Sequence, residues 1–149
     1  MIMLQDNITD NFTWQEVFVS SSFPELAQQT RLLHFNDIIE VRIESLFQYL
    51  IQPIRDDIKT PIVLPSVLRS YQLNEAVGGS KTSDHLIGNA ADMVFPQWVG
   101  GIKKLYDHIR SVYSAHFGQL ICYHDKDMIH ISGPIRGRRG EAWVAKNLA

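Results

Sequence analysis

The sequence predicts a single α+β domain in which helices flank a small antiparallel sheet. The chain has 149 residues, of which 45% are hydrophobic, so it can bury one core of ordinary domain size. Its strongest helical pattern comes before its clearest strands, which is typical of the α+β class. The last two predicted strands are separated by a short polar turn, which indicates a hairpin. We therefore expect one domain over residues 1–149.

The first part of the chain is predicted to contain two short helices. Residues 1–11 are mostly polar, and we expect them to be loosely held. Thr13 can cap a helix over residues 13–19, because Glu16 three positions later completes a capping box. A proline at the first position of residues 24–29 suits the start of a second helix.

The strongest helix is predicted over residues 36–56. Asn36 is a suitable N-cap, and Pro53 is expected to kink the helix or end its regular part. Apolar residues recur at steps of three and four, which predicts a stripe that faces the core. The stripe contains Ile38, Ile39, Val41, Ile43, Leu46, Phe47, Leu50, Ile51 and Ile54.

The second half is predicted to hold most of the sheet. Its expected elements are a strand over residues 61–68, a loop around residues 78–81, a strand over 90–95, a helix over 99–116, and strands over 118–123 and 128–132. Pro65 inside the first of these strands implies a sheet edge or a bulge. The polar residues 124–127 join the last two strands as a hairpin turn. In the helix we expect one apolar face, formed by Ile102, Leu105, Tyr106, Ile109, Val112 and Tyr113.

Residues 83–92 (Ser-Asp-His-Leu-Ile-Gly-Asn-Ala-Ala-Asp) carry the most specific chemistry. They place His85 and Asp92 seven positions apart, and Gly88 between them allows a tight turn. Imidazole nitrogen and carboxylate oxygen are ligands that suit zinc. His130 offers a third ligand, and three protein ligands with one open position are typical of a catalytic zinc site.

Strand geometry allows these three side chains to meet. On the last predicted strand His130 alternates with Ile129 and Ile131, so the isoleucines face the core and His130 faces the opposite side. Asp92 lies in the middle of the strand over 90–95, and His85 lies on the loop that precedes it. The ligands converge if the two strands are neighbours.

The pattern Ser-x-His-x-x-Gly-x-Ala-x-Asp, followed by a histidine on a late strand, resembles the M15 zinc peptidases. That family contains D-alanyl-D-alanine carboxypeptidases and peptidoglycan endopeptidases with a hedgehog-like core. Five further segments are similar to it: residues 12–21, 64–70, 73–85, 119–121 and 136–139. Several of them resemble subfamily A of M15, its short, phage-type branch, and the similarity covers nearly the whole chain.

The resemblance implies a Zn²⁺ ion held by His85, Asp92 and His130. It also implies a carboxylate, usually a glutamate, three positions before the last histidine, which acts as general base and acid. Asp127 occupies that position with a side chain shorter by one methylene, so His124 and Asp125 remain alternatives for the base. Asp127 could instead be only a turn residue that leads into the strand, a position that suits aspartate.

Arg69 is implied to stabilise the tetrahedral intermediate or to bind a carboxylate of the substrate, for which the planar guanidinium is suited. Val67 and Leu68 precede it where the family often has glycine and an aromatic residue. Three further side chains are expected to bind substrate or support the site: Ser83, Asn74 and Gln119. We expect structural roles for His34, His108 and His116, and Trp98 has the best claim to a substrate rim.

Charge and composition restrict the remaining possibilities. Fourteen basic and sixteen acidic residues give a net charge of −2, without the basic face that nucleic-acid binding requires. The local cluster of Arg136, Arg138 and Arg139 is read either as a solvated turn or as a contact for an anionic substrate or glycan. The single cysteine, Cys122, excludes a disulfide within the chain.

No signal-peptide pattern is seen at the N-terminus, and no segment approaches the roughly 20 apolar residues of a membrane span. We expect a monomer in the cytoplasm of the producing cell, which reaches the cell wall after release or delivery by another factor.

The function implied by the resemblance is zinc-dependent hydrolysis of peptide bonds in peptidoglycan stem peptides. The enzyme would be a D-Ala-D-Ala carboxypeptidase or an L-Ala-D-Glu-type endopeptidase, in a phage or prophage protein for lysis or entry. A catalytically weak or inactive zinc-bound module, which binds the wall or builds the virion, is the main alternative. A metal-free structural domain is the third.

Overall fold

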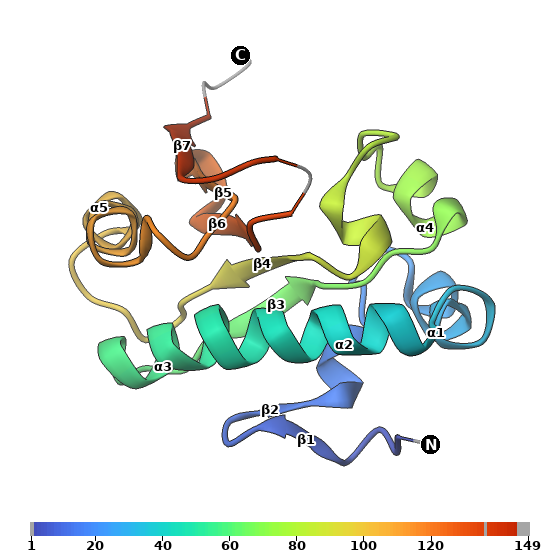
Figure 1. Cartoon of the computed structure of the whole chain (residues 1–149). Helices are drawn as coiled ribbons and strands as arrows, with labels where there is room; N and C mark the ends of the chain where they lie inside the picture. The colour runs from blue at the N-terminus through green and yellow to red at the C-terminus, as the bar shows by residue number, and fades with distance from the viewer. Residues whose placement is uncertain (1, 136, 146–149) are drawn as a thin grey trace.

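The computed structural model describes residues 2–135 and 137–145, which form an α+β fold with a five-stranded sheet (Figure 1). The strand order is β3-β4-β6-β5-β7. The strands are β3 (Val63–Ser66), β4 (Ala90–Val94), β5 (Gln119–Tyr123), β6 (Met128–Ser132) and β7 (Glu141–Val144). The predicted fold class and the β5–β6 hairpin are confirmed.

The sheet differs from the prediction in one pair. All neighbouring strands run antiparallel except β5 and β7, which are parallel. β7 was not predicted, because it is short and its side chains are mostly exposed, so it lacks an alternating pattern. β3 lies at the sheet edge with an irregular register, as Pro65 implied.

The long helix is continuous (Figure 1) and contains a wide turn. It consists of α2 (Asp37–Leu46), the π-helical turn η2 (Phe47–Ile51) and α3 (Gln52–Ile58). The Asn36 side chain caps it by accepting a hydrogen bond from the Ile39 amide at 2.9 Å. Pro53 neither ends nor sharply breaks the helix, because η2 directly before it provides the wider turn that a proline needs.

The buried stripe of this helix is narrower than predicted. Ile38 and Val41 are 64% and 60% exposed, whereas the other seven predicted positions are buried. The steps of three and four therefore identified the correct face, but two apolar residues at its margin remain in solvent. On α5 (Ile102–Tyr113) the same error occurs at Val112, which is 52% exposed.

The N-terminal segment contains a strand pair that the sequence did not predict; residue 1 lies outside the described residues. β1 (Asn7–Thr9) pairs with β2 (Phe12–Thr13) in a separate two-stranded sheet. Ile2, Leu4 and Ile8 pack against the core. The scattered apolar side chains of a polar segment thus anchor it.

Short helices surround the sheet. In η1 (Trp14–Val17) the predicted capping pair is present, with the Glu16 carboxylate 2.7 Å from the Thr13 amide that donates to it. The remaining helices are α1 (Pro24–Leu33), α4 (Tyr71–Ala76), η3 (Asp84–Ile87) and η4 (His124–Lys126). The prediction made α1 too short and missed α4, because tertiary packing stabilises short helices that the local pattern does not reveal.

One face of the sheet is covered by helices, and the other carries the polar side chains. Buried apolar residues at every second strand position face α2–α3 and α5. They are Leu64, Ala91, Met93, Leu120, Cys122, Ile129 and Ile131. Because side chains alternate along a strand, Asp92 and His130 point to the opposite face. The fold thereby separates the core from the candidate site.

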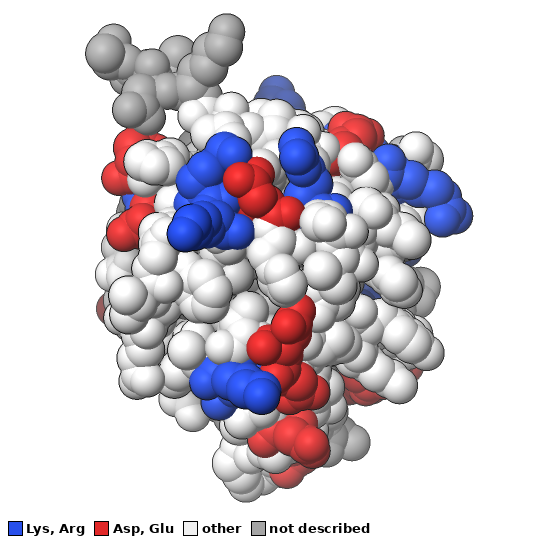
Figure 2. Space-filling view, turned by 90° about the vertical axis from the view of Figure 1, so that its left-hand side faces the viewer, with Lys and Arg blue, Asp and Glu red and all other residues white. Residues whose placement is uncertain are grey.

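The surface carries charges of both signs. On the face drawn in Figure 2, Lys and Arg lie beside Asp and Glu among large uncharged areas, without a field of one sign. Among the described residues, no helix has the length and apolar character needed to cross a membrane.

Candidate metal centre

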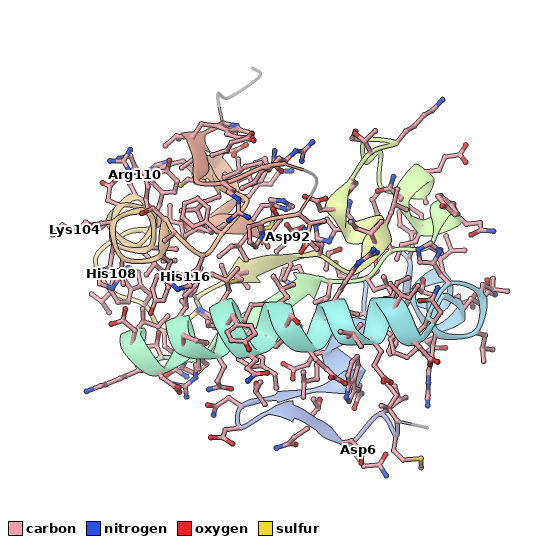
Figure 3. All side chains as sticks on the ribbon, viewed as in Figure 1. Asp6, Asp92, Lys104, His108, Arg110 and His116 are labelled. Carbon is pink, nitrogen blue, oxygen red and sulfur yellow. The ribbon has the colours of Figure 1, made fainter. Side chains whose placement is uncertain are left out.

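Pairing of β4 with β6 brings two of the predicted ligands together. Asp92 and His130 are direct partners in the antiparallel register, so their side chains leave the sheet side by side on the face away from the core. The expected neighbourhood of the two strands is confirmed. In Figure 3, Asp92 lies near the middle of the molecule, whereas His108 and His116 lie on the α5 side.

The third side chain, His85, comes from η3, which is held in place by a tight turn. Gly88 ends η3 with φ +75°, and a Cβ atom there would lie 2.8 Å from Ile39 Cγ2 on α2. The Ser83 hydroxyl accepts a hydrogen bond from the His85 amide at 3.2 Å, so it caps the start of η3. The predicted roles of Gly88 as a turn and Ser83 as loop support agree with this geometry.

Three side chains that the sequence analysis did not assign to the site hold the same loop. A ring nitrogen of His34 donates to the Leu86 carbonyl at 2.5 Å, and Arg42 donates to the Ile87 carbonyl at 3.3 Å. Asn89 donates to the Gly133 carbonyl at 3.1 Å. No local motif marks these residues, because each bonds a backbone atom far away in the sequence.

Two imidazole nitrogens converge on one carboxylate oxygen. Nε2 of His85 lies 3.3 Å and Nδ1 of His130 lies 3.0 Å from Asp92 Oδ1. One donor atom from each side chain lies within 4.8 Å of the other two, and all three residues are buried. These distances place the donors around a single small volume.

The electrostatics of the cluster keep His85 and Asp92 in metal-binding forms. Burial lowers the pKa of His85 and outweighs the neighbouring Asp92, so its imidazole is neutral. Its Nδ1 lies 2.6 Å from the Val67 carbonyl, which can only accept a hydrogen bond, so the lone pair remains on Nε2, toward Asp92. Burial disfavours the Asp92 carboxylate, yet attraction to His85 and the hydrogen bond with His130 hold its pKa well below its usual range.

Two imidazoles and one carboxylate are a donor set that fits Zn²⁺ and other divalent transition metals. The Val67 carbonyl supplies the outer hydrogen bond that metal-bound histidines commonly have. The residues present therefore fit the metal that the sequence predicts.

Arg69 stands beside the cluster with every donor nitrogen engaged. Its Nε donates to Ser66 Oγ at 3.0 Å, Nη1 to Asn74 Oδ1 at 3.3 Å, and Nη2 to Asp92 Oδ2 at 3.4 Å. Burial lowers its pKa, which Asp92 opposes, and a guanidinium remains charged at neutral pH. Asn74 in turn donates to the Ser80 carbonyl at 2.9 Å, so it ties Arg69 to the loop.

The cluster opens into a pocket of about 450 Å³ between the loop of residues 77–85 and the strands β5 and β6. Arg69, Ser83 and Gln119, three of the predicted site residues, line it. Asn74 does not line this pocket and instead supports Arg69 from behind. Tyr123 also lines the pocket and was not predicted; it could have been identified from its alternation with Gln119 on the predicted strand.

The structure does not bring Asp127 to the other site residues. It is exposed, has a left-handed backbone with φ +49°, and lines a neighbouring pocket that contains Trp98. Lys126 lines both pockets. His124 and Asp125, the alternative bases, are also exposed on η4 and do not line the pocket of the cluster.

A buried His–Asp–His cluster at the base of an open pocket, on the polar face of an α+β sheet, could hold a metal ion with the donor set that metal-dependent hydrolases use. The family profile of Peptidase M15 matches residues 23–132, a segment that begins at α1 and ends with β6. The chain belongs to the peptidase M15 family, in agreement with the resemblance seen in its sequence. No curated protein sequence matches the chain.

Proposed function

We propose that the protein is a zinc-dependent peptidase that hydrolyses peptide bonds in peptidoglycan stem peptides. The observation that carries this proposal is the convergence of His85, Asp92 and His130 beside Arg69 in an open pocket, in a chain of the M15 family. When bound, zinc supplies a Lewis acid that polarises a carbonyl group and acidifies water. Substrate binding, charge stabilisation and proton transfer are carried out by side chains of the protein.

In this proposal the three clustered side chains are the zinc ligands, and Arg69 acts on the substrate. Its guanidinium is held by Ser66, Asn74 and Asp92, so it can face negative charge without moving. It stabilises the charge that develops on the scissile carbonyl or binds a carboxylate of the stem peptide. Ser83 and Gln119, on opposite walls of the pocket, contact the substrate.

Asp127 is the proposed general base and acid. Among the described residues, the carboxylates that line the pocket are Asp92, a proposed ligand, and Asp84, which is buried and ion-paired with Arg138 at 3.5 Å. Asp127 directly precedes β6, which carries His130. The proposal requires the η4 turn to bring its carboxylate into the pocket when substrate binds, where it takes a proton from the attacking water and passes it to the leaving amine.

The direct test is to incubate zinc-loaded protein with purified peptidoglycan, with and without a chelator, and to identify released fragments by mass spectrometry. Chelator-sensitive release is expected, and the new termini distinguish a D-Ala-D-Ala carboxypeptidase from an L-Ala-D-Glu-type endopeptidase. His130→Ala and Asp127→Asn should both be inactive, and only His130→Ala should lose zinc. Intact wall of several chemotypes, with stoichiometric zinc bound, would contradict the proposal.

The exposed position of Asp127 favours one alternative, a zinc-bound wall-binding or virion structural module with weak or no activity. Asp127→Glu separates the two functions, because a longer carboxylate restores activity only to a degenerate peptidase site. Co-sedimentation of the inactive wild type with peptidoglycan would support the binding module.

We also propose a phage or prophage role in lysis or entry, as the segments that resemble the phage-type branch suggest, with the protein acting as a monomer. Expression inside cells with and without a protein that opens the inner membrane tests this role. Lysis of cells that contain both proteins is expected; cells that stay intact with both proteins present would contradict this role.

A further inference from the structure

Tyr123 lies on the site face of β5, one step along the sheet from the proposed ligands. In the β5–β6 pair Ile121 is opposite His130, and Tyr123 is opposite Met128. The intervening Cys122 is fully buried on the core face, so Tyr123 points to the same side as His130. A tyrosine side chain is long enough to reach a diagonal neighbour on the adjacent strand, which here is His130 on β6.

The surroundings of Tyr123 belong to the pocket of the cluster. It lines the pocket together with Arg69 and Asp92. The Lys126 ammonium lies 5.6 Å from the centre of its ring, which holds one side of the ring by a cation–π contact. Within the described part of the chain, its hydroxyl has no hydrogen-bond partner, so it is available to a bound molecule.

Tyr123 therefore differs from Arg69 as a hydrogen-bond donor. Nε, Nη1 and Nη2 of Arg69 each have a protein partner already, whereas the Tyr123 hydroxyl has none in the described chain. A phenol is protonated at neutral pH, and burial, followed by the nearby Asp92, raises the pKa of Tyr123 further. The pocket thus contains a neutral donor that no other described side chain engages.

We propose that Tyr123 is a further catalytic residue, whose hydroxyl donates a hydrogen bond to the oxygen of the scissile carbonyl as negative charge develops there. A fixed donor aimed at developing charge stabilises the transition state more than the ground state. This inference rests on the proposed peptidase function and adds a second donor, separate from Arg69, to the same site.

The test uses Tyr123→Phe, which removes the hydroxyl and keeps the ring over Lys126. Tyr49→Phe is the matched control, because Tyr49 is 61% exposed on η2 and lies outside the pocket of the cluster. Zinc-loaded proteins are titrated calorimetrically with phosphinate analogues of D-alanyl-D-alanine and L-alanyl-D-glutamate, whose tetrahedral, negatively charged phosphorus group resembles the transition state. Bound zinc is measured in parallel.

Tyr123→Phe should keep stoichiometric zinc and bind the better phosphinate about 10- to 100-fold more weakly than wild type, as expected for one hydrogen bond to a charged group. With a stem-peptide substrate, kcat should fall about 100-fold with little change in KM. Tyr49→Phe should behave as wild type in each measurement.

Each other outcome decides between the two proposals. Equal phosphinate affinity in wild type and Tyr123→Phe, or loss of zinc from Tyr123→Phe, overturns the role of Tyr123. If phosphinate binding depends on Tyr123 but the wild type leaves peptidoglycan intact, only the peptidase proposal is contradicted. A zinc-loaded wild type that binds neither phosphinate overturns both.

Discussion

A backbone atom selects the donor nitrogen of His85. The Val67 carbonyl holds Nδ1 at 2.6 Å, and this leaves Nε2 for the cluster. The same residue stands where the M15 resemblance leads us to expect a small residue before Arg69. Because the contact uses the carbonyl, the identity of the side chain at position 67 does not alter it, and the departure from the family pattern leaves the cluster intact.

Two variants of the cluster should separate zinc binding from the support of Arg69. His130→Ala and Asp92→Asn should both lose stoichiometric zinc, measured by elemental analysis after dialysis. Only Asp92→Asn also removes the carboxylate that faces the partly buried Arg69 at 3.4 Å. In chelator, Asp92→Asn should therefore be destabilised by about 3 kcal/mol, as for breaking a buried ion pair, whereas His130→Ala should change much less. Equal denaturant midpoints of the two zinc-free variants would show that Asp92 does not support Arg69.

Arg69→Lys should lower kcat/KM for a stem peptide by about 10- to 100-fold, because a single ammonium cannot reproduce the planar fork that contacts three partners. Zinc content should stay near stoichiometric. Arg110→Lys, the same change at an exposed position of α5, is the control and should leave the rate unchanged. Full activity of Arg69→Lys would remove Arg69 from the proposed mechanism.

At the scale of elements, η3 and its turn hold one ligand against the long helix. Gly88→Ala forces an alanine to adopt φ +75° and places its Cβ 2.8 Å from Ile39 Cγ2. Gly78→Ala is a matched control, since Gly78 has φ +73° and a Cβ atom added there would meet no atom within 4 Å. Gly78→Ala should cost about 1–2 kcal/mol from conformation alone, and Gly88→Ala more, with weaker zinc binding. Equal losses in thermal melts would show that the contact with Ile39 is absorbed without cost.

The helices α3 and α5 are tied by a carboxylate at the surface. Asp57 Oδ2 accepts hydrogen bonds from His108 Nε2 at 2.7 Å and from the Tyr113 hydroxyl at 3.1 Å. The hydrogen bond from His108 lowers the pKa of Asp57 most, and burial raises the pKa of Tyr113 to about 12. The histidine for which the sequence predicts a structural role therefore joins two helices.

This tie predicts a pH-dependent stability difference. A carboxyl group whose pKa is lowered on folding stabilises the protein above its ordinary pKa of 3.8, and this contribution is lost as pH falls below that value. The difference in melting temperature between wild type and Asp57→Asn should be present well above that pKa and shrink as the pH is lowered through it. A difference that is constant with pH would mean that ionised Asp57 does not tie the helices.

For the whole molecule, zinc should act as a stabilising ligand, because its proposed ligands come from η3, β4 and β6. A metal that binds only the folded state, at about 1,000 times its Kd, adds about 4 kcal/mol, which corresponds to several degrees in melting temperature. Addition of zinc to metal-free wild type should raise the melting temperature, and a chelator should reverse the change. His130→Ala should not respond. A wild type that melts at the same temperature with and without zinc would contradict the proposed cofactor.

Much of the fold follows from local pattern. The bounds of β6, the edge position of β3, the β5–β6 hairpin and the face of α5 could be predicted, because side-chain alternation and helical spacing report burial within one element. β7, α4 and the N-terminal strand pair could not, because each is short and depends on contacts outside its own segment.

The sequence by itself determined the family and the three metal-binding candidates. His85 and Asp92 are close in the sequence and joined by a short turn, and the alternation of His130 with isoleucines on a strand shows which face it occupies. The tertiary structure decided which side chains join them. It gives each guanidinium nitrogen of Arg69 a hydrogen-bond partner, leaves Asp127 exposed in the pocket that contains Trp98, and brings Tyr123 into the pocket of the cluster. These outcomes depend on strand register and on packing between segments far apart in the chain, and spacing along the sequence carries no record of either.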